Sequence, residues 1–239
     1  MFSKLATALA FAGLLASGTL HASTITYTSI PGTSSDGPLS ASAAFTTSAG
    51  QISIVLTNLI SATTIRDVGQ AIADLSFTLS NSPGTLTSST ATGQQGTISS
   101  TGQVTYTSGT PGRFIGSGGG TAIGTSGNTI TLESIGGGQP TELIMPFIAN
   151  GSSYGNTNPG IASHNDYTIG SATFVLALSG VTANTTVTGA TFSFGTAPDT
   201  FLPGTPGTPP VPEPSSLLLL GTGIVGAAGV MRRKLFAGV

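Results

Sequence analysis

Very few side chains in this sequence could carry acid–base chemistry. His164 lies two positions before Asp166, in a run rich in Asn, Gly and Ser. A histidine oriented by a carboxylate can act as a general base. Residues two apart on a strand, however, share a face without touching well enough to orient each other. We therefore interpret His164 and Asp166 as residues of a polar turn loop, and we assign no catalytic residue there.

A second pair of candidate residues is acidic. Glu133 and Glu142 are nine positions apart across a run of three glycines, residues 136–138, so they could face each other over a hairpin. Paired carboxylates of this kind perform glycoside hydrolysis. Two ordinary surface acids would give the same pattern, so a glycan-active hydrolase remains the alternative rather than the main hypothesis.

Binding of metals and cofactors finds little support in the residue types. The chain has no cysteine, which excludes thiolate zinc sites, cysteine nucleophiles and disulfides. No calcium loop of the EF-hand type is present. Residues 221–226 match G-x-G-x-x-G, but no βαβ unit can follow in the few residues that remain. We predict no cofactor and no metal.

Carbohydrate contact is the specific activity that the residue types favour most. Sugar sites combine aromatic faces with amide and hydroxyl groups. Residues 149–167 bring together Tyr154, Tyr167, Asn156 and His164 in one predicted loop. The chain has no tryptophan, the residue that offers the largest stacking face. An Asn- and Gly-rich turn loop with its tyrosines packed on the rim is the competing interpretation.

The charge balance excludes nucleic acid as a partner. Charged residues make up 6% of the chain, against about 25% in an average soluble domain. Between the two end segments, two arginines stand against seven acidic residues, a formal charge of −5 (2 − 7). Such a domain has no basic surface for phosphate contacts.

The N-terminal segment has the features of a secretory signal peptide. Lys4 precedes an apolar run over residues 5–20, and Ala22 supplies a small residue before the expected cut. We predict a signal peptide over residues 1–22 and the Sec translocon as its partner.

The C-terminal segment combines a spacer, a short motif, an apolar run and a basic end. Residues 196–211 are rich in Pro and Gly and predict a semi-stiff linker. Pro212, Glu213 and Pro214 follow. Residues 217–231 are apolar, near the lower limit for a membrane span. Positively charged residues next to a span stay cytoplasmic, so the expected anchor stop consists of Arg232, Arg233 and Lys234.

This order of features resembles the PEP-CTERM sorting signal. The resemblance implies that Pro212, Glu213 and Pro214 are recognised by exosortase, a membrane protease-transpeptidase of Gram-negative bacteria. It also implies export, transient anchoring in the inner membrane by the C-terminal helix, and an association with exopolysaccharide and biofilm. It covers only about the last 29 residues and implies nothing about the fold of the central domain.

The central residues 23–195 predict an antiparallel β domain. Apolar residues alternate with polar or small ones at 52–56, 75–79, 174–178 and 190–194, the period of half-buried strands. Residues 67–74 have a weak helical spacing. Short strands separated by Gly-rich turns indicate a β-sandwich or jelly roll, flanked by a signal helix and a transmembrane helix.

These observations lead to one main expectation. The chain is expected to be an exported, non-catalytic protein of the cell surface or extracellular matrix, with polysaccharide as a binding partner. The alternative is an extracellular glycan hydrolase built on a β-sandwich.

Overall fold

The computed structural model describes residues 23–60, 66–108, 122–133, 143–164, 166–197, 199–208 and 222–223. The chain divides into two compact units, residues 1–207 and residues 208–239. The predicted signal peptide lies outside the described residues, as does nearly all of the predicted membrane segment. Among the residues described, no helix is both long and apolar enough to cross a bilayer.

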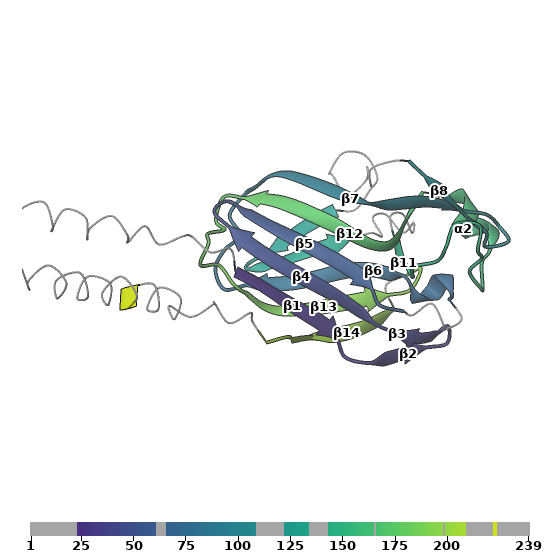
Figure 1. Cartoon of the computed structure of the whole chain (residues 1–239), viewed down its shortest axis with the longest axis horizontal. Coiled ribbons are helices and arrows are strands. Elements are labelled where there is room, and N and C mark those ends of the chain that lie inside the picture. Colours follow the sequence, from purple (N-terminus) through teal and green to yellow (C-terminus); the bar gives the residue numbers. More distant parts are fainter. Residues whose placement is uncertain are drawn as a thin grey trace, which may run out of the picture. The chain divides into compact units, whose positions relative to one another are not determined.

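The first unit is mainly β (Figure 1). The two helices described in it are short, the 3₁₀ helix η1 (Val68–Gln70) and α2 (Pro159–Ser163). The described strands are β1 (Ser23–Ser29), β2 (Gly32–Ser34), β3 (Gly37–Leu39), β4 (Ala41–Ser48), β5 (Gln51–Asn58), β6 (Ile72–Leu79), β7 (Leu86–Ile98), β8 (Val104–Thr107), β9 (Ala122–Ser126), β10 (Thr129–Glu133), β11 (Ile144–Met145), β12 (Tyr167–Leu178), β13 (Val187–Phe194) and β14 (Thr200–Pro206).

Twelve of the described strands form one continuous sheet, in the order β8-β7-β12-β5-β4-β1-β14-β13-β6-β10-β9, with β11 off this path. The two-residue strand β11 pairs in parallel with β12 and antiparallel with β6. It thereby closes a barrel-like ring of β12, β5, β4, β1, β14, β13, β6 and β11. The expectation of a mainly antiparallel β domain is confirmed, whereas the sandwich or jelly roll is not.

The alternating stretches form the strands that their period predicts. In β4 and β5, every second residue is buried and the residues between are partly exposed. The buried side chains meet inside the ring, where Phe45 lies 5.0 Å from Phe77 and 6.0 Å from Tyr27 between ring centroids. The Tyr27 hydroxyl donates to the carbonyl of Val187 at 3.0 Å. Burial of these large apolar side chains is the main stabilising contribution to the fold.

The weak helical spacing of residues 67–74 is confirmed over the single turn η1. β6 begins directly after it, because Gly69 weakens a helix and Ile72 pairs within the sheet. Residues 200–206, expected in the linker, form β14 beside β1 and β13. Prolines are tolerated where their missing N–H is not needed by the ladder. Residues 122–126, which showed no clear alternation, form β9.

A buried amide network holds the end of the ring where β11 closes it. The Asn58 side chain donates to the carbonyls of Gln70 (2.9 Å) and Ile144 (3.2 Å). Gln70 in turn donates to the carbonyl of Pro38 at 2.9 Å. Both amide side chains are buried. The network therefore joins β5, η1, β11 and the β2–β3 hairpin by hydrogen bonds that water cannot replace.

We predict that Asn58→Ala destabilises the domain strongly. The change leaves two buried carbonyls without their donor, which costs about 1–3 kcal/mol for each group. Urea unfolding of the mature protein measures the loss. Asn184→Ala is the matched control, because Asn184 is exposed and no hydrogen bond to its side chain is present among the described contacts. Equal stability of the two variants would contradict the role assigned to the network.

Candidate functional site

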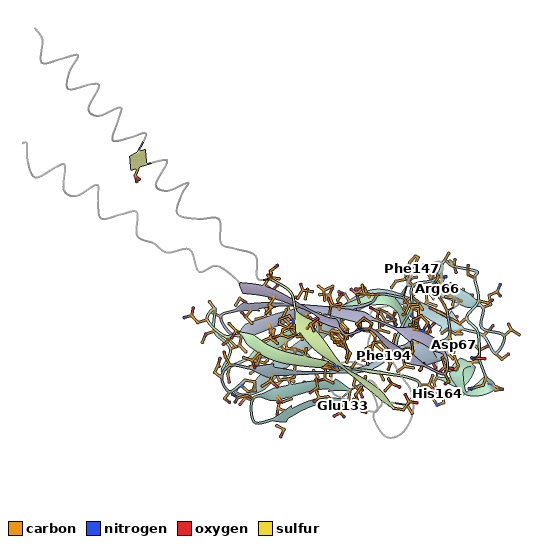
Figure 2. All side chains as sticks on the ribbon, turned by 90° about the horizontal axis from the view of Figure 1, so that it is seen from below. Arg66, Asp67, Glu133, Phe147, His164 and Phe194 are labelled. Carbon is orange, nitrogen blue, oxygen red and sulfur yellow. The ribbon has the colours of Figure 1, made fainter. Side chains whose placement is uncertain are left out.

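The candidate site lies at the end of the ring that carries η1, β8, α2 and the segment between β11 and β12. A second apolar cluster fills this end, separate from the main core. Its buried members are Val68, Ala71, Ala73, Ile98, Val104, Leu143, Met145, Ile148, Tyr154, Ile161, Tyr167 and Ile169. Figure 2 shows Arg66, Asp67, Phe147 and His164 at this end of the domain.

The two tyrosines of the predicted sugar site are buried here. Tyr167 has no exposed surface, and Tyr154 is 3% exposed. The Tyr154 hydroxyl donates to the carbonyl of Pro146, and the Tyr167 hydroxyl donates to that of Ile161 at 2.9 Å. Burial raises the pKa of both phenols, and the nearby Arg66 guanidinium opposes part of that rise in Tyr154. Neither ring offers a face to a ligand, so both act as packing residues.

Asn156 and His164 lie nearer the surface of the same segment. Asn156 is exposed and has a left-handed backbone, with φ of 49°. This conformation is tolerated by Asn better than by most residues. His164 caps the C-terminus of α2, and its Nδ1 contacts the carbonyl of Gly160. Their contact with carbohydrate stays a prediction, without the stacking faces that the tyrosines were expected to supply.

The described residues show no contact within the first candidate catalytic pair and contain only one member of the second. No hydrogen bond joins His164 to Asp166 among the described contacts. Glu133 ends β10, opposite Asp74 on β6, and lies apart from His164 (Figure 2). Its expected partner Glu142 lies outside the described residues. Asp74 accepts a hydrogen bond from Ser193 at 3.0 Å.

A serine motif between β11 and α2 also lacks the local structure that its chemistry would require. Residues 151–155 read Gly-Ser-Ser-Tyr-Gly and match the G-x-S-x-G pattern of serine hydrolases. That pattern requires a sharp turn between a strand and a helix. Here Ser153 forms an isolated antiparallel bridge with Gln103, and Tyr154 points into the second apolar cluster. The motif is a loop sequence that forms backbone hydrogen bonds with Val104 at the start of β8.

Asp67 is a buried carboxyl that the sequence analysis assigned only to a weak helix. It caps η1 by accepting from the N–H of Gly69 at 3.0 Å, while Gln70 accepts from the N–H of Asp67 at 2.8 Å. Burial raises the pKa of Asp67, and the nearby carboxylate of Asp36 raises it further. Hydrogen bonds from Gly69 and Asn156 oppose the rise. The D-x-x-Q spacing is the capping signal that could have revealed this residue.

Phe147 is the exposed aromatic residue among the described residues at this end of the domain, with 54% of its surface accessible. Its side chain lies against Gly170 in β12, where a Cβ would approach the Phe147 Cβ to 3.2 Å. Gly170 also has a φ of +81°, a conformation that favours glycine. Because position 170 has no side chain, the Phe147 ring packs against the backbone there, and about half of the Phe147 surface remains accessible. Nothing in the sequence pattern distinguished Phe147 from a core residue.

Metal binding finds no cluster in the described part of the chain. No group of three or more His, Asp or Glu side chains is close enough to hold an ion there.

Comparison with known proteins identifies the C-terminal segment. Residues 210–234 match the family model described as the PEP-CTERM protein-sorting motif. No curated protein and no solved structure matches the chain significantly. The chain therefore carries a PEP-CTERM motif, which supports an exported protein that is sorted by exosortase and anchored in the membrane transiently. The motif includes Pro212, Glu213, Pro214 and the basic residues 232–234, all of them outside the described residues.

We predict that Asp67→Asn changes how stability depends on pH. The raised pKa means that Asp67 favours folding below its unfolded pKa of about 4, and that this contribution is lost as pH rises through the folded pKa. Asn keeps the oxygen that caps η1 but has no charge to bury. Relative to wild type, Asp67→Asn should therefore gain stability between pH 3 and pH 7 in urea unfolding.

Two comparisons make this test specific. Asp67→Ala removes the cap and should lose about 1 kcal/mol throughout the range. Asp166→Asn removes one negative charge at an exposed position and controls for net charge. If Asp67→Asn and Asp166→Asn behave alike, the burial of Asp67 has no effect on stability.

Proposed function

We propose that this chain is a non-catalytic protein displayed on the surface, or released into the extracellular matrix, of a Gram-negative bacterium. The match of residues 210–234 to the PEP-CTERM protein-sorting motif carries the proposal. A signal peptide over residues 1–22 is its N-terminal counterpart, and the Sec translocon and exosortase are the proposed partners in export. The domain between them is proposed to act in exopolysaccharide or biofilm by binding.

A non-catalytic role is supported by how the polar groups of the candidate site are used. The hydroxyls of Tyr154 and Tyr167 are bound to backbone carbonyls. The Asp67 carboxyl caps a helix, and the His164 ring nitrogen contacts the carbonyl of Gly160. Groups committed to folding in this way are poorly placed to bind a substrate and to move its protons.

Binding of a neutral polymer is supported by the composition of the sheet. Strands β1, β4, β5, β7, β8 and β12 contain no Asp, Glu, Lys or Arg. Their outward positions carry mainly Ser and Thr, which form hydrogen bonds with sugars without competing counter-charges. Phe147 is the aromatic residue that we propose stacks on a sugar face, at the end of the sheet where Asn156 and His164 also lie.

We predict that sorting depends on Glu213. In the native host, mature wild-type protein should lack the first 22 residues and everything beyond the Pro-Glu-Pro region, because exosortase recognises that motif. Glu213→Ala should retain the C-terminal segment. Intact mass measures both ends, and Glu133→Ala is the matched control for loss of a glutamate outside the motif. An uncut C-terminus in every form would indicate a plain membrane anchor.

We predict that Phe147→Ala weakens the retention of the protein by its host's exopolysaccharide. Stacking on an aromatic face contributes about 1 kcal/mol, so the loss in affinity should be several-fold in affinity electrophoresis. Phe201→Ala is the matched control, since Phe201 is 61% exposed on β14. Equal loss in both variants would remove Phe147 from the proposal. Release of reducing ends that disappears in Glu133→Gln would replace binding by hydrolysis.

A further inference from the structure

The first half of β7 is an open sheet edge. β7 has β12 on one side along its length, but on its other side β8 pairs only with residues 95–98. Among the described strands, the stretch Ser88–Thr92 therefore has one row of backbone N–H and C=O groups without a neighbour. No hydrogen bond from another described residue occupies that row. An exposed row of this kind is a template for pairing with another strand.

This open edge lacks the features that usually protect one. Charged residues, prolines and bulges keep edge strands from pairing with other chains. Ser88–Thr92 contains neither a charge nor a proline, and the shifts in register of β7 against β12 fall outside it, next to Gly93 and beyond Ser88. Ser88, Thr90 and Thr92 are exposed, whereas Ala91 packs in the core.

The edge at β8, by contrast, is covered within the chain. The N–H of Val104 donates to Ser152 at 2.9 Å, and the N–H of Gly151 donates to Val104 at 2.8 Å. The Asn150 side chain accepts from the N–H of Tyr106 at 3.0 Å. The loop that contains Tyr154 therefore covers β8, and none of its described hydrogen bonds reaches the first half of β7.

The side chains beside the open edge form a neutral, hydroxyl-rich surface. Thr90 aligns with Val175, and the same row continues through Ser53, Thr46 and Thr24 on the next three strands. Hydroxyl pairs already link neighbouring strands of this sheet, at 3.0 Å between Thr24 and Thr46 and 3.1 Å between Thr57 and Ser171. Cross-strand hydroxyl pairs of this kind contribute to sheet stability.

We propose that Ser88–Thr92 pairs with the same segment of a second copy of this chain. Two identical strands pair antiparallel about a two-fold axis, so each copy supplies the same surface and the contact closes as a dimer. A strand that pairs here must have an unpaired edge of its own and must not bring like charges together. Ser88–Thr92 of a second copy meets both conditions, because its edge has no described partner strand and it contains no charged residue. The resulting sheet runs through both copies, and its neutral face doubles in width. The pairing itself is inferred from the sheet, whereas its expected occupancy on the cell envelope rests on the proposed function.

The dimer contact is small, so concentration decides its occupancy. Five residues of strand pairing bury far less than the roughly 1,200–2,000 Å² of a stable complex. Anchoring of chains in one membrane raises their effective concentration, as linking does for two binding modules, and so favours such a contact. We therefore expect dimers on the cell envelope, and monomers after dilution of the released protein.

Cysteine cross-linking of the full chain in its host tests the proposal, since the natural sequence has no cysteine. Paired antiparallel strands place opposite Cα atoms about 4.5–5.5 Å apart, within reach of a disulfide. Under mild oxidation, Thr90→Cys should form disulfide dimers about ten-fold more than Thr26→Cys, a control at another exposed position, on β1. Co-expressed Ser88→Cys and Thr92→Cys should cross-link more than either variant alone.

A non-covalent variant completes the test. Adding Ser88→Lys and Thr92→Lys to Thr90→Cys places like charges across the two-fold axis and should abolish the cross-link. Adding Thr28→Lys instead should leave it unchanged. Equal cross-linking of Thr90→Cys and Thr26→Cys would overturn the proposal. Cross-linking of Thr90→Cys to Thr125→Cys on the edge strand β9, in preference to itself, would also overturn it, because that contact builds an open chain rather than a dimer.

Discussion

Closure of the ring depends on hydrogen bonds that a very short strand could not secure alone. β11 contributes only Ile144 and Met145, and a single pair of residues aligns it with β6. The Asn58 side-chain amide donates one hydrogen bond to the carbonyl of Ile144 and another to the backbone carbonyl of Gln70. Because the side chains of Asn58 and Gln70 are both buried, breaking either of these hydrogen bonds leaves a polar group without a partner in the core. The second apolar cluster then packs over this closure.

This arrangement explains why the candidate site is built mainly from structural residues. Asp67 begins η1, and Gln70 in the same turn reaches the β2–β3 hairpin. The hydroxyls of Tyr154 and Tyr167 donate to the backbone carbonyls of Pro146 and Ile161, both in the segment between β11 and β12. What remains free for a partner is the periphery of the cluster, where Phe147 is exposed, and the neutral faces and edges of the sheet.

The sequence predicted the parts of the fold that a local period can reveal. Alternation at 52–56, 75–79, 174–178 and 190–194 identified β5, β6, β12 and β13 together with their buried faces. β14 was missed because its Pro- and Gly-rich sequence resembles a linker, and its pairing with β1 depends on residues far away in the chain. The ring was missed for the same reason, since two residues of β11 carry no periodic signal.

The candidate site was predicted less well than the fold, for a different physical reason. Tyrosines beside Asn and Gly have the composition of a sugar site, but composition does not show whether a ring faces solvent or core. Tyr154 and Tyr167 face the core because their rings pack against the apolar side chains of the second cluster, at the end of the sheet that carries β8. The sorting motif could be recognised because it is a linear signal, read by a partner from the order of its residues.

The pairing of β1 with β14 bears on how this protein leaves the cell. β1 pairs early in the sequence with β4, but on its other side the Thr205 hydroxyl donates to the carbonyl of Thr28 at 3.1 Å, across 177 positions of sequence. The ring therefore closes at β1 only when almost the whole domain is available. Contacts this distant in sequence make folding slow. On the export route proposed above, in which the N-terminus crosses the membrane first, the ring closes only after β14 has reached the outer side.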